Sequence, residues 1–297
     1  MTVVRTPEEA PAAERAVAIG TFDGVHRGHR AVLAAAGDTG LRPAAVTFDP
    51  HPRAVLGYEV QLLTTIGRRL ELLANAGPED VLVVEFTPEL SRLEPDAFAE
   101  TVLRPFGAHT VLAGEGFRFG AGRRGDLDLL RGLGFEVRPV PLVPGVSSSR
   151  IRELRREGDV REAAALLGRP HELEGVVVAG DQRGGTLGFP TANLAVSADL
   201  LVPAYGIYAG VAVPLDGDGA GTSFRTALSI GVNPHYGGVE RRIEAFLLDF
   251  EGDLYGRPLR IELWDRLRDE RAFTSEEELV DQIAKDVAAA RAVRKPG

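Results

Sequence analysis

The twenty residues 17–36, VAIGTFDGVHRGHRAVLAAA, decide the fold of the first half of the chain. The apolar run Val17–Thr21 predicts a buried strand, and His29–Ala36 predicts a helix. Gly20 and Gly24 allow a tight turn between the two elements, with backbone amides that stay accessible. A strand, a glycine-rich turn and a helix in this order begin a βαβ unit, which is the building block of parallel sheets.

The same alternation continues from this unit to about residue 144. Short apolar runs alternate with helical patterns, which indicates a parallel sheet covered by helices. Ligands of such sheets bind at the carboxyl ends of the strands. The further expected strands are 44–48, 81–86, 110–113 and 137–143, and the further expected helices are 68–76 and 96–103.

The pattern changes near residue 170. A helical stretch over 148–168 is followed by short strands between Gly, Pro and Asp turns, without helices between them. Such strands indicate a small antiparallel barrel or sandwich. The chain closes with a helix that Ser275 and Glu278 begin as a capping box. The expected strands are 173–178, 207–213, 225–230, 242–248 and 259–263, and the apolar stripe of the last helix is Leu279, Ile283 and Val287.

The chain is therefore expected to have a flexible N-terminus (1–15), an α/β domain (16–170) and a β domain (171–297). Its length of 297 residues fits two domains of roughly 100–200 residues each. The net charge of −9 and the lack of a basic run predict neither nucleic acid nor an anionic membrane as partner. Without an apolar signal core or a run of roughly 20 apolar residues, we expect a cytoplasmic protein.

Two residue types exclude whole classes of chemistry. The chain has no cysteine, which excludes disulfides, thiolate zinc sites, iron–sulfur clusters and cysteine nucleophiles. Its only lysines are Lys285 and Lys295, near the C-terminus. A P-loop and a protein kinase each need a lysine much earlier in their motifs. A nucleotide site in this chain must therefore use arginine, histidine, backbone amides and metal.

His26 and His29 lie where the first predicted helix begins, and their spacing places them on one face of that helix. A helix N-terminus offers unpaired amides and the positive end of the helix dipole. Two imidazoles there can donate to phosphate oxygens and stabilise charge on a pentavalent α-phosphate. The alternative is a glycine turn with two surface histidines, which an isolated pair of this spacing would favour.

A second glycine-rich segment, GDQRGGTLGFPTAN, spans residues 180–193. Its glycines permit close approach of a phosphate without a lysine. Thr191 and Asn193 supply hard oxygen atoms, the ligand type that Mg²⁺ prefers. The alternative for the last four residues is a turn capped by the asparagine.

Glu244 carries the most specific chemical prediction. On its expected strand it points to the same side as Phe246 and Leu248. Apolar neighbours disfavour the charged form of a carboxylate, so we expect the pKa of Glu244 to be raised. A raised pKa suits a general base that takes the proton of a primary hydroxyl. The alternative is a glutamate at the rim, paired with Arg241 or Arg242.

Together these segments resemble the bacterial bifunctional riboflavin kinase/FAD synthetase family over residues 16–293. Residues 20–29 resemble the HxGH signature of nucleotidyltransferases, and residues 180–193 resemble the signature of riboflavin kinases. The other matching segments are TFDPHP (47–52), LTT (63–65) with Arg68 and Leu72-Leu73, GEGFRFG (114–120) with Gly125-Asp126, VSSSRIR (146–152), GIYAG (206–210), SIGVNP (229–234), RIEAFLL (242–248), DLYG (253–256) and LRDE (267–270) with Phe273.

The resemblance implies a Rossmann-like, doubly wound nucleotidyltransferase domain, followed by a small antiparallel β-barrel of the riboflavin kinase type with a terminal helix. It implies two reactions. In one, the γ-phosphate of ATP moves to the 5′-hydroxyl of riboflavin and gives FMN. In the other, AMP from ATP joins the FMN phosphate and gives FAD and pyrophosphate. Mg²⁺ is the implied cofactor, the partners are these small molecules, and the chain is a monomer or a transient homo-oligomer.

The resemblance also assigns residues, with His26, His29 and Glu244 as the catalytic ones. For the adenylyltransferase it implies ATP contacts at Gly20, Phe22, Asp23, Gly24, His26, His29, Ser148, Ser149 and Arg152, and flavin contacts at Asp49, His51, Pro52 and Phe117. For the kinase it implies ATP contacts at Gly180, Gly184, Gly188, Pro190, Thr191 and Asn193, the last two holding the metal, and flavin contacts at Tyr208, Leu267, Arg268, Glu270 and Phe273.

Three positions depart from the usual pattern of this family. Gly116 stands in place of Asp or Asn, which removes a polar contact from the adenylylation site. Gly185 stands in place of Arg, which weakens a phosphate or flavin contact of the kinase, whereas Ser149 in place of Thr keeps its hydroxyl. The two glycines leave open a protein with only one of the two activities.

Two different functions fit the sequence less well. A nucleotidyltransferase that acts on pantetheine phosphate or a pyridine mononucleotide should lack the second domain. A non-catalytic flavin sensor has no need of both histidines, Asn193 and Glu244.

Overall fold

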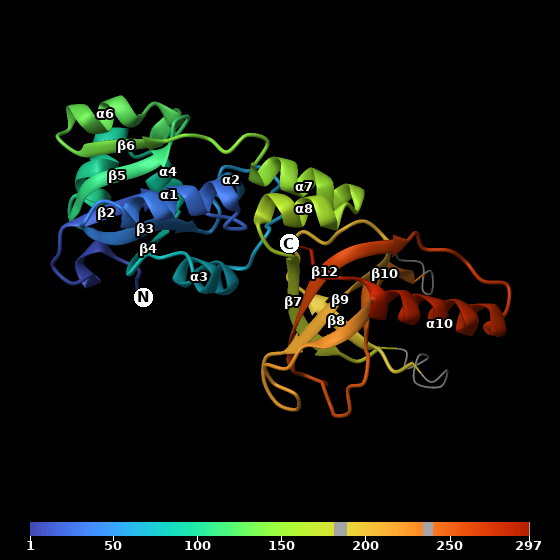
Figure 1. Cartoon of the computed structure of the whole chain (residues 1–297). Helices are drawn as coiled ribbons and strands as arrows, with labels where there is room; N and C mark the ends of the chain where they lie inside the picture. The colour runs from blue at the N-terminus through green and yellow to red at the C-terminus, as the bar shows by residue number, and fades with distance from the viewer. Residues whose placement is uncertain (181–188, 234–239, 297) are drawn as a thin grey trace. The chain divides into compact units, whose positions relative to one another are not determined.

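A computed structural model describes residues 1–180, 189–233 and 240–296, which form two units, Met1–Ser148 and Ser149–Gly297 (Figure 1). The first unit is built on a six-stranded sheet in the order β1-β4-β3-β2-β5-β6, and all neighbouring strands run parallel. The strands are β1 (Thr2–Val4), β2 (Arg15–Ile19), β3 (Arg42–Asp49), β4 (Asp80–Glu85), β5 (Ala108–Gly114) and β6 (Glu136–Val140). The winding changes direction between β2 and β5, and this switch point is where open α/β sheets bind their ligands.

Helices cover both faces of this sheet, so the doubly wound fold is confirmed. Ala16 and Ala18 of β2 share a buried cluster with α1 and α3. Their neighbours Val17 and Ile19 belong to the opposite cluster, with α5, η2 and α6, as the alternation of side chains along a strand requires. The short and long helices are η1 (Pro7–Glu9), α1 (Arg27–Gly37), α2 (Pro52–Val55), α3 (Ile66–Ala74), α4 (Pro88–Ser91), α5 (Pro95–Phe98), η2 (Ala99–Leu103), η3 (Ala121–Arg123) and α6 (Leu127–Gly132).

Parts of the segment 1–15, whose flexibility stays a prediction, belong to the folded unit. Thr2–Val4 pairs in parallel with β4 at the edge of the sheet. Arg15, which is 1% exposed, donates from Nε to Asp80 at 2.8 Å and from Nη1 to the carbonyl of Phe106 at 2.8 Å. The sequence does not reveal this strand, because three residues are too few to show periodicity and their partner strand is distant in the chain.

The second unit is a closed barrel of antiparallel strands in the order β10-β11-β8-β7-β12-β9. This result decides between the barrel and the sandwich. One strand of the barrel, β8, was not predicted from the sequence. It has only five residues, and they follow directly on Pro190 and Thr191. The strands are β7 (His171–Val178), β8 (Ala192–Val196), β9 (Gly206–Pro214), β10 (Phe224–Asn233), β11 (Glu240–Leu247) and β12 (Pro258–Arg268).

In the described part of the second unit, three helices accompany the barrel: α7 (Ser148–Glu157), α8 (Val160–Leu167) and α10 (Glu276–Ala292). By its contacts α8 packs on β7 and β12, whereas α10 packs on β9, β10 and β12. Ser275 caps α10 as predicted, since the Glu278 amide donates to Ser275 Oγ at 3.1 Å. The Glu278 carboxylate accepts from the Thr274 amide at 3.1 Å and does not complete the predicted capping box. The two units divide at residues 148 and 149, and the domain boundary near residue 170 stays a prediction. None of the helices in the described ranges has the length and hydropathy needed to cross a membrane.

Candidate active sites

The turn after β2 has an unusual backbone. Phe22 and Val25 take positive φ angles of 49° and 39°, and Gly24 takes 84°. A β-branched residue such as Val25 rarely adopts this conformation, which costs free energy unless its surroundings hold it in place. Strained backbone of this kind concentrates at functional sites. The strain lies at the carboxyl end of β2, beside the switch point of the sheet.

Asp23 holds this turn in place. Its carboxylate is fully buried and accepts hydrogen bonds from the amides of Leu63 at 3.0 Å and Thr64 at 3.1 Å. The Thr64 hydroxyl also donates to Asp23 at 3.3 Å and accepts from the Gly24 amide at 3.1 Å. The segment 63–65 is thereby tied to the turn, and the contact of Asp23 with ATP stays a prediction.

His26 and His29 come together as predicted at the start of α1. Their rings stack with centroids 3.6 Å apart and planes inclined by 15°. His26 is the N-cap residue, and its Nδ1 accepts from the His29 amide at 3.2 Å. A neutral His26 therefore carries its proton on Nε2. Gly28 leaves room for this ring, since a Cβ at residue 28 would lie 3.2 Å from Cε1 of His26.

The serine segment reaches the same turn through Ser148. Its hydroxyl donates to the carbonyl of Asp23 at 3.2 Å. The residue begins α7, and Ser149 and Arg152 follow on that helix in the second unit. The expected hold of Ser149 and Arg152 on pyrophosphate stays a prediction.

The predicted flavin contacts of the first unit follow β3 and β5, the two strands that flank β2. Asp49 ends β3, and its Oδ2 lies 4.0 Å from Nη1 of Arg5. His51 is buried and caps α2, with Nδ1 accepting from the Arg53 amide at 3.2 Å, and Pro52 begins that helix. Phe117, after β5, stacks on Phe119 with centroids 5.6 Å apart.

Arg69 was not predicted as part of a site. It is 1% exposed and donates from Nη1 to the carbonyl of Phe48 at 2.9 Å. Burial lowers the pKa of Arg69, while the charges of Asp23 and Asp49 act in the opposite direction. A buried cation therefore stands near the ends of β2 and β3. Its burial could have been expected from the sequence, since Arg69 lies one helical turn before the buried Leu72 and Leu73.

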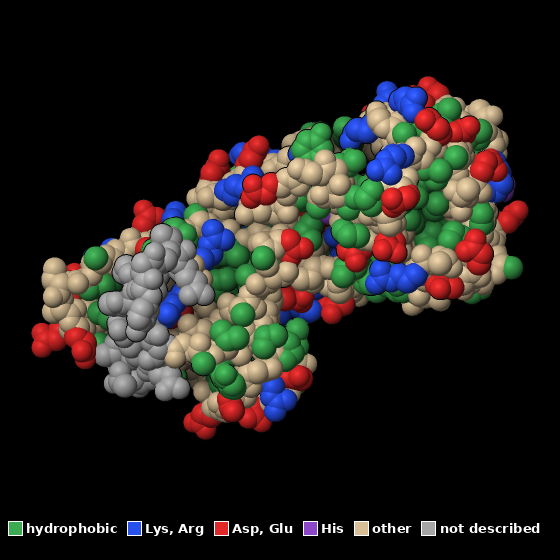
Figure 2. Space-filling view, turned by 180° about the vertical axis from the view of Figure 1, so that it is seen from behind, with side chains coloured by type: hydrophobic (Ala, Val, Ile, Leu, Met, Phe, Trp, Pro, Cys, Tyr) green, Lys and Arg blue, Asp and Glu red, His purple; other side chains and the backbone are tan. Residues whose placement is uncertain are grey.

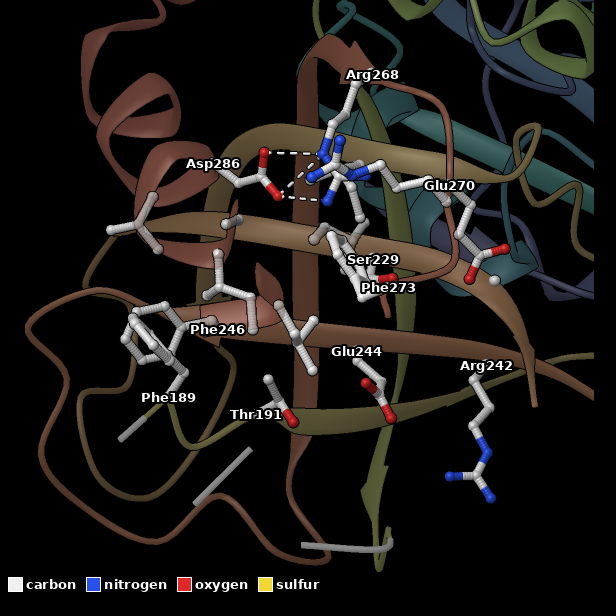
Figure 3. Close-up of a pocket in the computed structure, with 18 of the residues that line it drawn as sticks. Phe189, Thr191, Ser229, Arg242, Glu244, Phe246, Arg268, Glu270, Phe273 and Asp286 are labelled. Carbon is white, nitrogen blue, oxygen red and sulfur yellow. Dashed lines mark hydrogen bonds and ion pairs between the residues drawn. The ribbon is translucent and has the colours of Figure 1, made fainter. Parts of the chain in front are cut away.

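The second unit contains a cavity of about 360 Å³ on the outer side of the barrel, against α10 (Figure 3). Strand register sets one polar row along its wall, because Asn193 of β8 lies opposite Glu244 of β11 and Glu244 lies opposite Ser229 of β10. All three line the cavity. Ile243 and Ala245, the residues on either side of Glu244, are buried in the barrel. Glu244 therefore faces the cavity from the middle of the row.

The cavity gathers six of the twelve predicted kinase residues. Phe189 forms an edge-to-face contact with Phe246, with ring centroids 5.5 Å apart. A Cβ on Gly180 would lie 2.0 Å from Nδ2 of Asn193, so any other residue at 180 would displace the side chain of this asparagine. Asn193 itself belongs to β8 and does not cap a turn. The predicted residues that line the cavity are Thr191, Asn193, Glu244, Arg268, Glu270 and Phe273.

Some predicted kinase residues lie elsewhere. Tyr208 is fully buried, donates to the carbonyl of Ala204 at 2.6 Å and is not among the residues that line the cavity. Its burial raises the pKa of the Tyr208 hydroxyl. Leu267 does not line the cavity either, and Pro190 is exposed. Gly184, Gly185 and Gly188 lie outside the described residues.

Several lining residues were not predicted as parts of a site. Ser229 completes the polar row, and Asp286 of α10 pairs with Arg268. Leu279, Ile283 and Val287, expected only as an apolar stripe, form the α10 side of the cavity. Only the closed barrel shows that this stripe faces a cavity.

The donor atoms beside Glu244 fit a magnesium ion. Thr191 offers a hydroxyl, Asn193 an amide oxygen and Glu244 a carboxylate, and all three side chains line one cavity. Mg²⁺ takes hard oxygen ligands, usually from one or two protein groups together with water and substrate phosphates. This set of donors suits an ion that arrives with a nucleotide.

Comparison with known proteins identifies both halves. Residues 8–152 match the family model described as FAD synthetase, and residues 167–294 match that of riboflavin kinase. A Listeria monocytogenes protein named bifunctional riboflavin kinase/FMN adenylyltransferase is 37% identical, over 97% of this chain and 95% of its own. Its Bacillus subtilis namesake is 34% identical, over 92% and 90%.

A solved structure supports the architecture of both units. A Streptococcus pneumoniae crystal structure described as a macrolide-efflux protein superposes with a TM-score of 0.87 at 29% identity, covering 98% of this chain and 99% of that one. Sequence similarity across nearly the full length, with matches to both family models, establishes the relationship. The chain belongs to the bifunctional riboflavin kinase/FMN adenylyltransferase family.

Proposed function

We propose that this chain makes FMN from riboflavin and ATP, and FAD from FMN and ATP. The observation that carries the proposal is that each unit has its own reactive side chains. The first unit has the stacked pair His26 and His29 at a helix N-terminus. The second has Glu244 beside Thr191 and Asn193 in one cavity.

In the kinase reaction, Glu244 takes the proton of the riboflavin 5′-hydroxyl as that oxygen attacks the γ-phosphorus of ATP, and ADP leaves. The polar row supports this order of groups. Glu244 lies between Asn193 on the phosphate side and Ser229 on the side of Phe273 and α10. Thr191 and Asn193 would hold the Mg²⁺ of the nucleotide, whose charge offsets that of the phosphates. The apolar residues of the cavity would receive the flavin ring.

In the adenylylation, a phosphate oxygen of FMN attacks the α-phosphorus of ATP and pyrophosphate leaves, without a covalent enzyme intermediate. His26 and His29 would donate to the α-phosphate oxygens, and the amides that begin α1 add to the positive field. Ser148, Ser149 and Arg152 would hold the leaving pyrophosphate. Asp49, His51, Pro52 and Phe117 would lie toward the flavin.

The test is to incubate the full chain with Mg-ATP and either riboflavin or FMN, and to separate the flavins by chromatography. We expect riboflavin to give FMN and then FAD, and supplied FMN to give FAD with equimolar pyrophosphate. If only one product forms, the chain has one activity and the proposal fails for the other. If neither forms but flavin binds, the protein is a flavin sensor.

Gly116 offers a direct test of whether the chain has only one activity. A Cβ at residue 116 would meet nothing within 4 Å, so the fold leaves room for the Asp or Asn that the family usually has. If the missing contact limits adenylylation, Gly116→Asn raises the rate of FAD formation and leaves FMN formation unchanged.

For its setting, we propose a cytoplasmic protein, monomeric or transiently oligomeric, whose partners are these small molecules. On the face shown in Figure 2, the Lys and Arg side chains drawn in colour are interspersed with Asp and Glu. Together with the net charge of −9, this distribution supports a protein without a nucleic-acid partner.

A further inference from the structure

Asp286 of α10 and Arg268 at the end of β12 form an ion pair in the wall of the kinase cavity (Figure 3). Arg268 Nε lies 2.9 Å from Oδ1 of Asp286 and Nη2 lies 2.6 Å from Oδ2. The Asp286 side chain is 9% exposed and that of Arg268 is 21% exposed. Gln282, one turn earlier on α10, also donates to Asp286 Oδ1 at 2.9 Å. Both oxygens of this carboxylate are used within the protein.

Few buried apolar side chains hold α10 against the barrel. Of its residues only Asp286 and Ala290 are buried, whereas its apolar stripe, Leu279 and Ile283 with Val287, lines the cavity. Side chains that face a cavity leave the helix with little packed surface to set its position. Bidentate arginine–carboxylate pairs are directional and fix geometry. The ion pair therefore sets how α10 lies on the barrel.

Among the described residues, the other ion pairs of α10 lie at its two ends. Arg291 pairs with Asp249 at 2.8 Å near the C-terminus, and Arg271 lies 3.4 Å from Glu278 near the N-terminus. The side chains of both pairs are 40% exposed or more, and exposed pairs hold their partners weakly. Between these ends, the contact between Arg268 and Asp286 is the shielded one.

We propose that Asp286 is a positioning residue of the kinase, which holds α10 so that its apolar stripe forms the wall for the flavin ring. The inference rests on the proposed riboflavin kinase activity. Arg268, predicted from the resemblance as a flavin contact, then acts through this wall, because its guanidinium is turned to Asp286. Loss of the pair should loosen the flavin side of the cavity and leave the phosphate side on β8 unchanged.

The test is Asp286→Asn, which keeps the shape of the side chain and removes its charge. We expect the KM for riboflavin to rise about tenfold while kcat and the KM for Mg-ATP change less than about twofold, the pattern of lost ground-state binding. Riboflavin binding without ATP, followed by flavin fluorescence, should weaken by the same factor. The matched control is Asp281→Asn, an exposed position of the same helix, which should change none of these values.

Two further variants keep the outcome decisive. Asp286→Glu retains the charge and should recover part of the riboflavin affinity, even if Asp286→Asn folds poorly. Arg268→Gln combined with Asp286→Asn should raise the KM for riboflavin no further than either change alone, because both remove one interaction. The inference is overturned if Asp286→Asn leaves riboflavin binding unchanged, raises both KM values equally, or adds independently to Arg268→Gln. Absence of FMN formation by the unmodified chain would instead refute the proposed kinase.

Discussion

The imidazole of His26 caps the helix to which His29 belongs, and the two rings stack with centroids 3.6 Å apart. The same side chain thus fixes the start of α1 and stacks on the ring of His29. This double use explains why the pair needs its spacing of three residues. A helix cap and the residue that donates to it are separated by that distance.

We first expect His29→Ala to lower FAD formation from FMN by about 10²–10³-fold, the usual effect of losing one donor to a transition-state oxygen. His26→Asn should lower it as well without loss of thermal stability, because asparagine is a good N-cap. FMN formation from riboflavin measures the second unit and should not change. Equal loss of both reactions in a folded variant would contradict separate sites.

Second, Gly28→Ala should separate stability from activity. Alanine favours a helix over glycine by about 1 kcal/mol, which offsets a weaker cap by His26, so the thermal stability should be roughly kept. The new Cβ would lie 3.2 Å from Cε1 of His26 and displace that ring, so we expect FAD formation to fall. Gly37→Ala, in the same helix with nothing within 4 Å of its Cβ, is the matched control. Unchanged adenylylation in Gly28→Ala would show that the stacked geometry is not needed.

Third, Glu244→Gln should lower FMN formation by about 10²–10⁴-fold, the range of general-base catalysis, and spare FAD formation from supplied FMN. The control is Glu251→Gln at an exposed position. A variant that retains full kinase activity would remove Glu244 from the mechanism.

Fourth, His171 makes the barrel sensitive to acid. Burial, and then the charges of Arg155 and Arg169, lower the pKa of His171 well below its ordinary value. Below about pH 6.5, His171 therefore binds a proton in the unfolded chain but not in the folded barrel. The contribution of neutral His171 to the free energy of unfolding is fully present above that pH. It falls on acidification, with a slope of up to ~1.4 kcal/mol per pH unit.

This prediction can be followed through Trp264, the single tryptophan of the chain, which lies in β12. Urea unfolding at pH 7.5, 6.5 and 5.5 gives the free energy of unfolding of the barrel. His171→Gln should flatten its dependence on pH, and His109→Gln, outside the barrel, should not. An unchanged slope in His171→Gln would assign the acid sensitivity to other groups.

The patterns of neighbouring residues predicted many of the strands and helices of both units. The expected strand over 17–21 corresponds to β2, and the expected helix over 29–36 lies within α1. The missed strands β1 and β8 are short, and each is stabilised by pairing with strands from distant parts of the chain. Local propensity is weak over three to five residues, so long-range pairing decides them.

The sequence by itself determined the types of reactive side chain, the absence of lysine from both predicted nucleotide sites, and the local elements that carry them. Tertiary structure alone decided that Asn193, Glu244 and Ser229 stand in one row, and that Asp286 pairs with Arg268 in the wall of the cavity. Helical and strand periods are properties of neighbouring residues, so one chain segment reveals them. Which strands become neighbours, and in what register, depends on closing the barrel as a whole.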